Sequence, residues 1–472
     1  MEFLQVLDAP VEPGGLIEWI PAVPGGLGAW HRDPRATSHN HEQHLQDAHA
    51  YRLATHRQGG REAWLGLTVE FDEQISQSAV QSAILGWINR HEVLRTHVTF
   101  TPGSQVSTER YTADAGTVHL RRRRIGWFAD PHQLIAQIGA SFDGATAPLH
   151  WPAYRFATVA RACSFTLLFA ADHSLVDGYS LVNAQFELRE MYRAALERRD
   201  PTLPATGSYV DFSDTERRAA DTADDWHTAA VEWREFTEGW RTLPGFALLE
   251  RAGPLDAGAP LLPQSAYDAL LLDDEATCVL EQRCGDLGGS LIGGLLTTAA
   301  LVYREQTGAD RFATVMPRHT RNQAAVHSAL GWFVALAPVS VEVSDDPSFP
   351  TALERMMVSL DRAREGASLP LLRLAELLDF VPEPKFVVSF MDTRAVPGAA
   401  HADAGGARAL RSHSYADDEF YVWFNRTPHG LRVHARFPAD RPGRPVAAGL
   451  RRFLSAFTEL LASIVAARQT DR

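Results

Sequence analysis

Cysteine is scarce in this sequence, and the three that occur, Cys163, Cys278 and Cys284, form no CxxC pair. An odd count without such a pair argues against a disulfide framework and against the usual zinc spacings, and it indicates a reducing compartment. A continuous apolar run of the ~20 residues that a membrane helix needs is also missing. Residues 1–15 carry acidic groups and early prolines where a signal peptide needs a basic start and an apolar stretch. We therefore expect a soluble, cytoplasmic protein that does not span a membrane.

Positive charge is in deficit, because 45 Lys and Arg face 58 Asp and Glu and the net charge is -13. This balance repels nucleic acid and anionic lipid, so small or protein-borne substrates are expected and nucleic acid is not. The remaining composition, 45% hydrophobic with 34 Gly and 27 Pro, is that of an ordinary globular protein. A chain of 472 residues can form two large lobes.

Hydrophobic periodicity predicts an α/β architecture in both halves of the chain. Residues 65–71 alternate as a half-buried strand does, and the helical spacing that follows predicts a helix that ends near residue 94. Residues 162–171 form a short apolar run typical of a buried strand, and helical spacing resumes at Tyr179. A further helix is predicted over 290–307, with Ser290 as its N-cap and Gly308 at its end. The first ~60 residues show weak periodicity and are expected to be irregular.

The composition also predicts a domain boundary. Residues 198–225 are rich in Pro, Ser, Thr, Asp and Arg, as are segments that join domains. We expect an N-terminal lobe over 1–197, an interlobe linker over 198–225 and a C-terminal lobe over 226–472. The histidine-rich segment HNHEQH at 39–44 falls in the stretch expected to be irregular, so no metal site is predicted there.

The pattern HxxxDG at residues 173–178 follows the predicted buried strand and lies in a loop between that strand and a helix. The imidazole of His173 titrates near pH ~6.5 when unperturbed, so it can take a proton from an attacking hydroxyl or amine and return one to a leaving thiolate. Asp177 can hold an arginine or fix the loop, and Gly178 permits a tight turn. Its amide is also a candidate donor to an oxyanion. Asp172 can either orient His173 or cap the helix that begins near Tyr179, and the pattern does not decide between these roles.

The motif alone has a chance expectation on the order of one in ten, but further segments match in order along nearly the whole chain. Together they make the sequence similar to the condensation-domain superfamily. The matching segments are RHEVLRT at 90–96, SYVDFSDTERR from Ser208, GGSLIGGLLTTAALVYREQTG at 288–308 and GWFVALAPV at 331–339. Within the superfamily the sequence resembles polyketide-associated (Pap-type) acyltransferases, through PGGLIEW near the start, EQHL at 42–45, GWF at 331–333, FVVSFMD at 386–392 and VWFNR at 422–426.

This resemblance implies two chloramphenicol-acetyltransferase-like lobes that form a V-shaped pseudo-dimer with a central tunnel. It implies that His173 is the catalytic base and that Asp177 pairs with an interlobe arginine, for which Arg321 is the first candidate and Arg318 the second. Asp172 and Gly178 are the remaining supporting residues. Candidate residues of the substrate tunnel are Asp392, Asn425 and Trp332.

The implied reaction moves an acyl group from a coenzyme A or phosphopantetheinyl carrier-protein thioester to a small-molecule alcohol, with no bound cofactor and no metal. An amine acceptor, as in a free-standing peptide-synthetase condensation enzyme, needs the same base and stays open. The cluster RRRR at 121–124 is a candidate docking patch for an acidic carrier protein or a solvated strand edge. A monomer is expected.

Two departures from the family pattern bear on these expectations. The usual motif begins with two histidines, whereas this chain has Asp172 before His173. Asp172, Asp177 and Ser180 also fit the DxxxxDxxS motif of heterocyclisation domains, but those domains lack the histidine retained here. The DFGWG sequence frequent in peptide-synthetase condensation domains is absent, which favours the stand-alone branch. A non-catalytic recruiting module is the alternative from another class, and the retained His173 and Gly178 speak against it.

Overall fold

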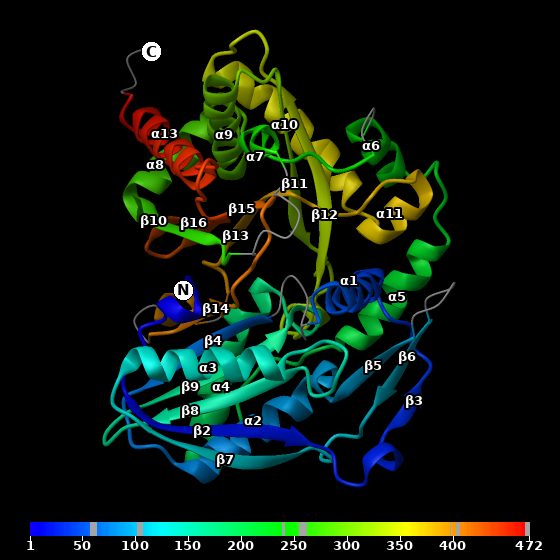
Figure 1. Ribbon diagram of the computed structural model, residues 1–472, viewed down its shortest axis with the longest axis vertical. Coiled ribbons are helices and arrows are strands. Elements are labelled where there is room, and N and C mark those ends of the chain that lie inside the picture. Colours follow the sequence, from blue (N-terminus) through cyan, green and yellow to red (C-terminus); the bar gives the residue numbers. More distant parts are fainter. Residues whose placement is uncertain are drawn as a thin grey trace. The chain divides into compact units, whose positions relative to one another are not determined.

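The computed structural model describes residues 1–56, 64–101, 107–237, 241–253, 262–396, 398–402 and 406–467. The chain forms two compact units (Figure 1). Unit 1 consists of Met1–Asp221, Thr320–Phe333 and Ala395–Ser414, and unit 2 consists of Thr222–His319, Val334–Arg394 and Tyr415–Arg472. Two segments from the second half of the chain therefore complete the unit that contains the N-terminus.

Unit 1 is built on a seven-stranded sheet with the order β1-β14-β4-β9-β8-β2-β7. The β1 and β14 strands run parallel, and the other neighbouring pairs are antiparallel. A second sheet has the order β3-β6-β5. The strands are β1 (Glu2–Gln5), β2 (Gly14–Ala22), β3 (His31–Asp33), β4 (Trp64–Phe71), β5 (Thr96–Thr101), β6 (Ser107–Thr112), β7 (His119–Phe128), β8 (Tyr154–Ala160), β9 (Phe165–Asp172) and β14 (Arg408–Arg411).

The helices of unit 1 come from all three of its segments. The α-helices are α1 (His39–Thr55), α2 (Gln77–Arg90), α3 (Pro131–Ala145), α4 (Gly178–Glu197), α5 (Tyr209–Asp221) and α12 (Ala399–Ala402). Short 3-10 helices are η1 (Val6–Asp8), η2 (Gly26–Ala29), η3 (Glu92–Arg95), η4 (His173–Leu175) and η5 (Ala324–Val326).

Strand β9 is the central element of unit 1, and every one of its residues is buried. Its side chains alternate between the two faces of the sheet. Leu168 and Ala170 share a core with Phe142 of α3, whereas Phe169 packs edge-on against Trp87 of α2, with ring centroids 5.0 Å apart. The prediction of a buried strand here is confirmed, and the carboxyl end of this strand delivers the HxxxDG motif.

Unit 2 is built on a six-stranded mixed sheet with the order β10-β16-β15-β13-β11-β12. Its core consists of inward-facing residues of this sheet and apolar residues of α8, α9, α10 and α13. The strands are β10 (Ser265–Asp273), β11 (Arg311–His319), β12 (Val334–Glu342), β13 (Phe386–Asp392), β15 (Phe420–Thr427) and β16 (Gly430–Phe437). The helices are α6 (Thr228–Phe236), α7 (Ala247–Ala252), α8 (Asp274–Asp286), α9 (Leu291–Thr307), α10 (Phe349–Gly366), α11 (Leu371–Leu378) and α13 (Val446–Ala466).

Helix α9 confirms the boundaries predicted from sequence. The Ser290 hydroxyl accepts a hydrogen bond from the amide of Gly293 at 3.2 Å, and Gly308 ends the helix at a φ of 67°. Within the helix, a Cβ added to Gly294 would lie 2.4 Å from Sγ of Cys284. The small residues of this segment therefore permit close packing of α9 on α8.

The expectation that the first ~60 residues are irregular is wrong. They contain β1, β2, β3 and helix α1. The Ser38 hydroxyl caps α1 by accepting from the amide of His41, and polar contacts with other elements, such as Glu42 to Arg217 at 2.6 Å, hold the helix. Tertiary contacts of this kind stabilise a helix that has little apolar periodicity of its own.

The residues expected to form an interlobe linker, 198–225, contain helix α5. Tyr209 and Val210 at its start are buried, and the helix up to Asp221 belongs to unit 1. The lobe boundaries at 197 and 226 stay a prediction about domains. Residues 209–221 of this segment form a helix that is part of unit 1.

The caps of α9 and α10 provide a stability test. We expect Ser290→Ala to lower the free energy of unfolding by about 1 kcal/mol, because the amide of Gly293 loses its side-chain acceptor. The matched control is Ser348→Ala, since Ser348 is the N-cap of α10 but its side chain makes no capping hydrogen bond. Urea unfolding followed by circular dichroism measures both. Equal losses in the two variants would contradict the assigned role of Ser290.

Candidate active site

The HxxxDG motif folds into two consecutive caps. Asp172 ends β9 and its Oδ1 accepts from the amide of Ser174 at 2.9 Å, which starts the 3-10 helix η4 that carries His173. Asp177 is the N-cap of α4, and its Oδ1 accepts from the amide of Ser180 at 2.7 Å. Of the two roles left open for Asp172, capping of the helix near Tyr179 is wrong. That cap is Asp177, because it directly precedes the helix.

Asp177 also pairs with Arg321, the first of the two candidate arginines, but both residues belong to unit 1, so this is a contact within one unit and not the interlobe pair expected. The Nη2 atom of Arg321 lies 3.0 Å from both carboxylate oxygens of Asp177, and both side chains are buried. The amide of Phe333 donates to Asp177 Oδ2 at 3.0 Å. The carboxylate thereby ties the motif to Thr320–Phe333, the later segment that belongs to unit 1. The second candidate, Arg318, lies on β11 in unit 2, where burial and then the charge of Arg364 lower its pKa.

Arg321 is held on its other sides as well. Its Nη1 donates to the carbonyls of Val326 at 2.9 Å and Ala329 at 2.6 Å, and its guanidinium lies 4.0 Å from the centroid of the Phe333 ring. A buried ion pair is stable only when further hydrogen bonds satisfy both ions. For the cation these contacts provide hydrogen bonds at Nη1, while its buried Nε has no partner among the described residues. For Asp177 the two amides provide them.

The imidazole of His173 is half-buried and packs against Trp332, with centroids 4.5 Å apart and planes inclined by 41°. Its Nδ1 is buried and has no hydrogen-bond partner within the described ranges. Trp332 was a candidate tunnel residue, and the structure places it in direct contact with the candidate base. The preceding Gly331 has no room for a side chain, because a Cβ there would lie 2.4 Å from Cγ of Tyr209.

A second histidine lies beside the motif and was not singled out from sequence. His44 of α1 places its Nε2 3.0 Å from Oδ2 of Asp172, and its ring meets Trp332 edge-on at 5.7 Å. His44 lies in the HNHEQH segment weighed as a metal site and in the EQHL match at 42–45, but neither pattern predicts a role for it beside His173. Within the part of the chain that the structure describes, no group of three or more His, Cys, Asp or Glu is arranged to hold a metal ion.

Arg90 and His91 of the RHEVLRT signature at 90–96 contact helix α4, which begins at the motif. The Glu187 carboxylate on α4 accepts from Trp87 Nε1 at 2.8 Å and Arg90 Nε at 3.0 Å, and lies 2.6 Å from His91 Nε2. Burial raises the pKa of Glu187, but the hydrogen bond with His91 and the neighbouring Arg90 charge outweigh it, so the net pKa is lowered. The Nδ1 of His91 accepts from the amide of Leu330. The signature thus joins α2 and α4 to the segment that contains Arg321.

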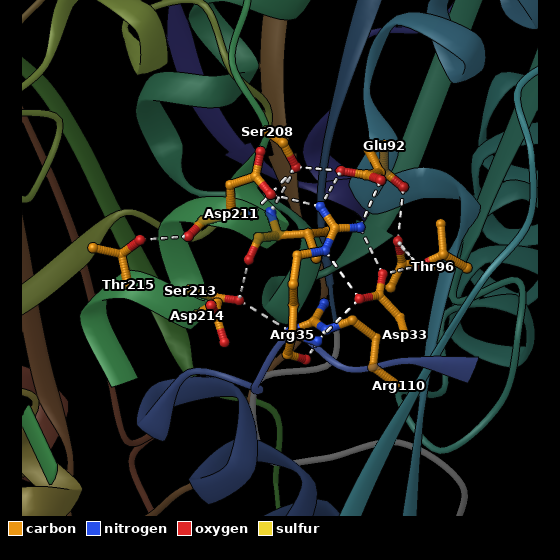
Figure 2. Close-up of polar contacts among 12 residues, drawn as sticks. Asp33, Arg35, Glu92, Thr96, Arg110, Ser208, Asp211, Ser213, Asp214 and Thr215 are labelled. Carbon is orange, nitrogen blue, oxygen red and sulfur yellow. Dashed lines mark hydrogen bonds and ion pairs between the residues drawn. The ribbon is translucent and has the colours of Figure 1, made fainter. Parts of the chain in front are cut away.

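Glu92, the third residue of that signature, belongs to a polar cluster around Arg35 (Figure 2). The guanidinium of Arg35 reaches Asp33 at 2.6 Å, Glu92 at 2.8 Å and Asp211 at 2.7 Å. Burial alone would raise the pKa of Asp33, but hydrogen bonds from Arg35 and Thr112 lower it to about 2. This cluster joins β3, η3 and the start of α5, so the second family segment, SYVDFSDTERR, is held by the first.

Two further candidates lie in unit 2. Asp392 ends β13, and its carboxylate contacts Arg394 at 2.6 Å. Burial raises the pKa of Asp392, but the hydrogen bond from Arg394 outweighs this and lowers it. Asn425 on β15 is buried, and its Nδ2 has no partner among the described residues. A role in lining a substrate tunnel stays a prediction for both.

Residues 49–388 match the family described as the condensation domain. The chain belongs to the condensation-domain family. It is an acyltransferase of the condensation-domain type, as its curated relatives are named. "Acyltransferase PapA3" of Mycobacterium tuberculosis is 27% identical over 92% of this chain and 93% of its own length. "2'-acyl-2-O-sulfo-trehalose (hydroxy)phthioceranyltransferase PapA1" of Mycobacterium bovis is 31% identical over 53% of this chain and 49% of its own length.

Solved structures show the same fold. The structure titled "PapA2 acyl transferase" superposes with a TM-score of 0.86 at 21% identity, covering 99% of this chain and 100% of that one. The first condensation domain of the calcium-dependent antibiotic synthetase gives a TM-score of 0.68 at 17% identity, covering 92% of this chain and 98% of that one. The mixed α/β condensation-domain fold predicted from the sequence motifs is confirmed. The V-shaped arrangement with a central tunnel stays a prediction.

Within the described ranges, no single helix is both long and apolar enough to cross a membrane. The bent pair formed by α8 and α9 reaches that length and composition only when the two helices are taken together.

The buried pair at the motif yields a prediction about stability. We expect Arg321→Met to lower the free energy of unfolding by about 3–5 kcal/mol, because the Asp177 carboxylate loses its cation while it stays buried. Arg304→Met is the matched control, since Arg304 pairs with the exposed carboxylates of Asp310 and Asp346 and its loss should cost much less stability, because solvent screens exposed ion pairs. Urea unfolding of both variants measures the difference. If they lose equal stability, the buried pair is not the stronger constraint.

Proposed function

We propose that this protein moves an acyl group from a coenzyme A or carrier-protein thioester to the hydroxyl of a small molecule and releases an ester. The observation that carries the proposal is the placement of His173. It is a half-buried imidazole between two aspartate caps, packed on Trp332, in a chain of the condensation-domain family. Relatives named as Pap acyltransferases support lipid or polyketide assembly as the setting.

In the proposed reaction, His173 accepts the proton of the acceptor hydroxyl while the oxygen attacks the thioester carbonyl. The new C–O bond forms, the C–S bond breaks, and the proton passes from the imidazolium to the thiolate. A positioned base of this kind contributes about 10²- to 10⁴-fold in rate. Asp177 does not take part in proton transfer, because its two oxygens already accept from the amides of Ser180 and Phe333 and pair with Arg321.

The role of His173 as the base can be tested with mixed donors and acceptors. Purified wild type and His173→Ala are incubated with panels of acyl-CoA and acyl-carrier donors and with mixed alcohols and amines, and products are identified by mass spectrometry. We expect an ester that depends on His173 and that the variant forms at least about 100-fold more slowly. An amide product would show that the acceptor is an amine and not a hydroxyl. A product formed equally by both proteins would refute the role of His173.

Whether the acyl donor is bound to a carrier protein can be tested at strand β7. This strand is the edge of the large sheet, and residues 121–124 are four consecutive exposed arginines on it. Arg123 pairs with the buried Glu18 at 2.6 Å and Arg122 contacts Gln77, so both have intramolecular partners. Arg121 and Arg124 are therefore the residues to change if an acidic carrier protein docks there.

We expect Arg121→Glu with Arg124→Glu to slow turnover of a carrier-bound donor several-fold at low salt, because charge attraction accelerates encounter. Turnover of the corresponding acyl-CoA should change much less. The control with the same change in net charge is Arg451→Glu with Arg452→Glu, two exposed residues of α13. If both double variants slow carrier turnover equally, the patch on β7 is not the docking site.

A further inference from the structure

The departure at position 172 has a structural counterpart on helix α1. The chain has Asp172 where the family motif has its first histidine, and the imidazole of His44 on α1 contacts the Asp172 carboxylate. Asp172 is fully buried, and His44 is nearly so. Their contact, Nε2 to Oδ2 at 3.0 Å, joins residues 128 positions apart in sequence. The imidazole is thus still beside the motif, but α1 supplies it.

The Asp172 carboxylate uses its two oxygens for different tasks. Oδ1 accepts from the amide of Ser174 and so fixes the first turn of η4, which carries His173. Oδ2 faces His44. A carboxylate with no exposed surface is costly unless donors satisfy it. Since a carboxylate can only accept, we take His44 to carry a hydrogen on Nε2 and to donate a hydrogen bond to Oδ2 of Asp172.

A second route from His44 to the candidate base runs through Trp332. The indole meets the His44 ring edge-on, at 85° and 5.7 Å, and packs against the His173 ring at 4.5 Å. His44 therefore restrains His173 from two directions, through the backbone turn that Asp172 caps and through the ring on which His173 rests. His173 itself has no hydrogen bond at Nδ1 to residues that the structure describes, so packing and the turn must set the orientation of its ring.

We propose that His44 is a positioning residue for His173 and acts through Asp172 and Trp332. The inference rests on the proposed function only in taking His173 as the base. In this chain Asp172 and His44 together take the supporting role that the first histidine of the family motif has beside the catalytic one. The change at position 172 therefore does not indicate a motif that has lost its function. A pair of residues on separate elements orients the base.

The alternative is that the pair only stabilises α1, and the same helix contains the matched control. His39 is also buried, and its Nε2 lies 2.9 Å from Oδ1 of Asp221 on α5. Both are buried histidines on α1 that contact a carboxylate. The contact between His39 and Asp221 involves neither His173 nor Trp332. Both His39→Leu and His44→Leu should therefore lose stability, the second more because Asp172 is fully buried whereas the Asp221 side chain is 49% exposed. Only His44→Leu should affect His173.

The first experiment needs no substrate. Native full-length protein is treated with diethyl pyrocarbonate, and carbethoxylation of His173 is timed by mass spectrometry of the tryptic peptide 162–189, in which His173 is the single histidine. We expect His44→Leu to raise the rate constant several-fold, because a ring that turns freely exposes Nδ1, which is buried in the wild type. His44→Gln, which can still donate to Asp172, should restore most of the wild-type rate. His39→Leu should not change it.

The second experiment uses the ester-forming assay. His44→Leu and Asp172→Asn should lower kcat by about 10- to 100-fold with KM nearly unchanged, because misplacing a reacting group slows the chemical step rather than binding. His39→Leu should keep its kcat. Asp172→Asn and His44→Gln keep the size of the replaced side chains, so the test stands if His44→Leu fails to fold.

The outcomes separate the inference from the proposed function. If His44→Leu and Asp172→Asn leave both the carbethoxylation rate and kcat at wild-type values, the inference is overturned and His44 is merely structural. If His173→Ala retains full activity, the proposed function fails, and the carbethoxylation rates still decide whether His44 orients His173. A changed rate in His39→Leu equal to that in His44→Leu also overturns the inference.

Discussion

The buried contact between Asp177 and Arg321 is the constraint on which the site depends. One carboxylate caps α4, receives the guanidinium and accepts the amide of Phe333. Because Arg321 is also held by two carbonyls of its own segment, the ion pair fixes the backbone that presents Trp332. The candidate base rests on that indole. The geometry around His173 is thus set by a charge pair that lies outside the proposed proton transfer.

The residues of the family signatures make specific contacts with one another. Arg90 and His91 hold Glu187 on α4, while Glu92 holds Arg35 and Ser208. The glycine of GWF leaves room for the ring of Tyr209 at the start of α5. The segments at 90–96, from Ser208 and at 331–333 therefore pack against one another in unit 1, and Phe333 also contacts Asp177 of the motif.

Local sequence rules predicted the elements whose signals are local. The cap residues of α9 and the apolar run of β9 have physical causes within a few residues, so both elements were predicted correctly. Helix α1 was missed because its stability comes from polar contacts with distant residues. For the same reason the sequence assigns no individual role to His44, although it lies in both HNHEQH and EQHL. Asp172 was left between two roles because the partner that decides its role lies 128 positions away.

The strand order of unit 1 has a consequence for synthesis on the ribosome. Strand β14 (Arg408–Arg411) lies between β1 and β4, although β1 and β4 are among the first strands to be translated. The sheet therefore has a gap until some 340 further residues have followed β4, and Arg321 is also missing from the nascent N-terminal segment for most of that time. The unit that carries the histidine motif cannot reach its final packing until β14 has been made.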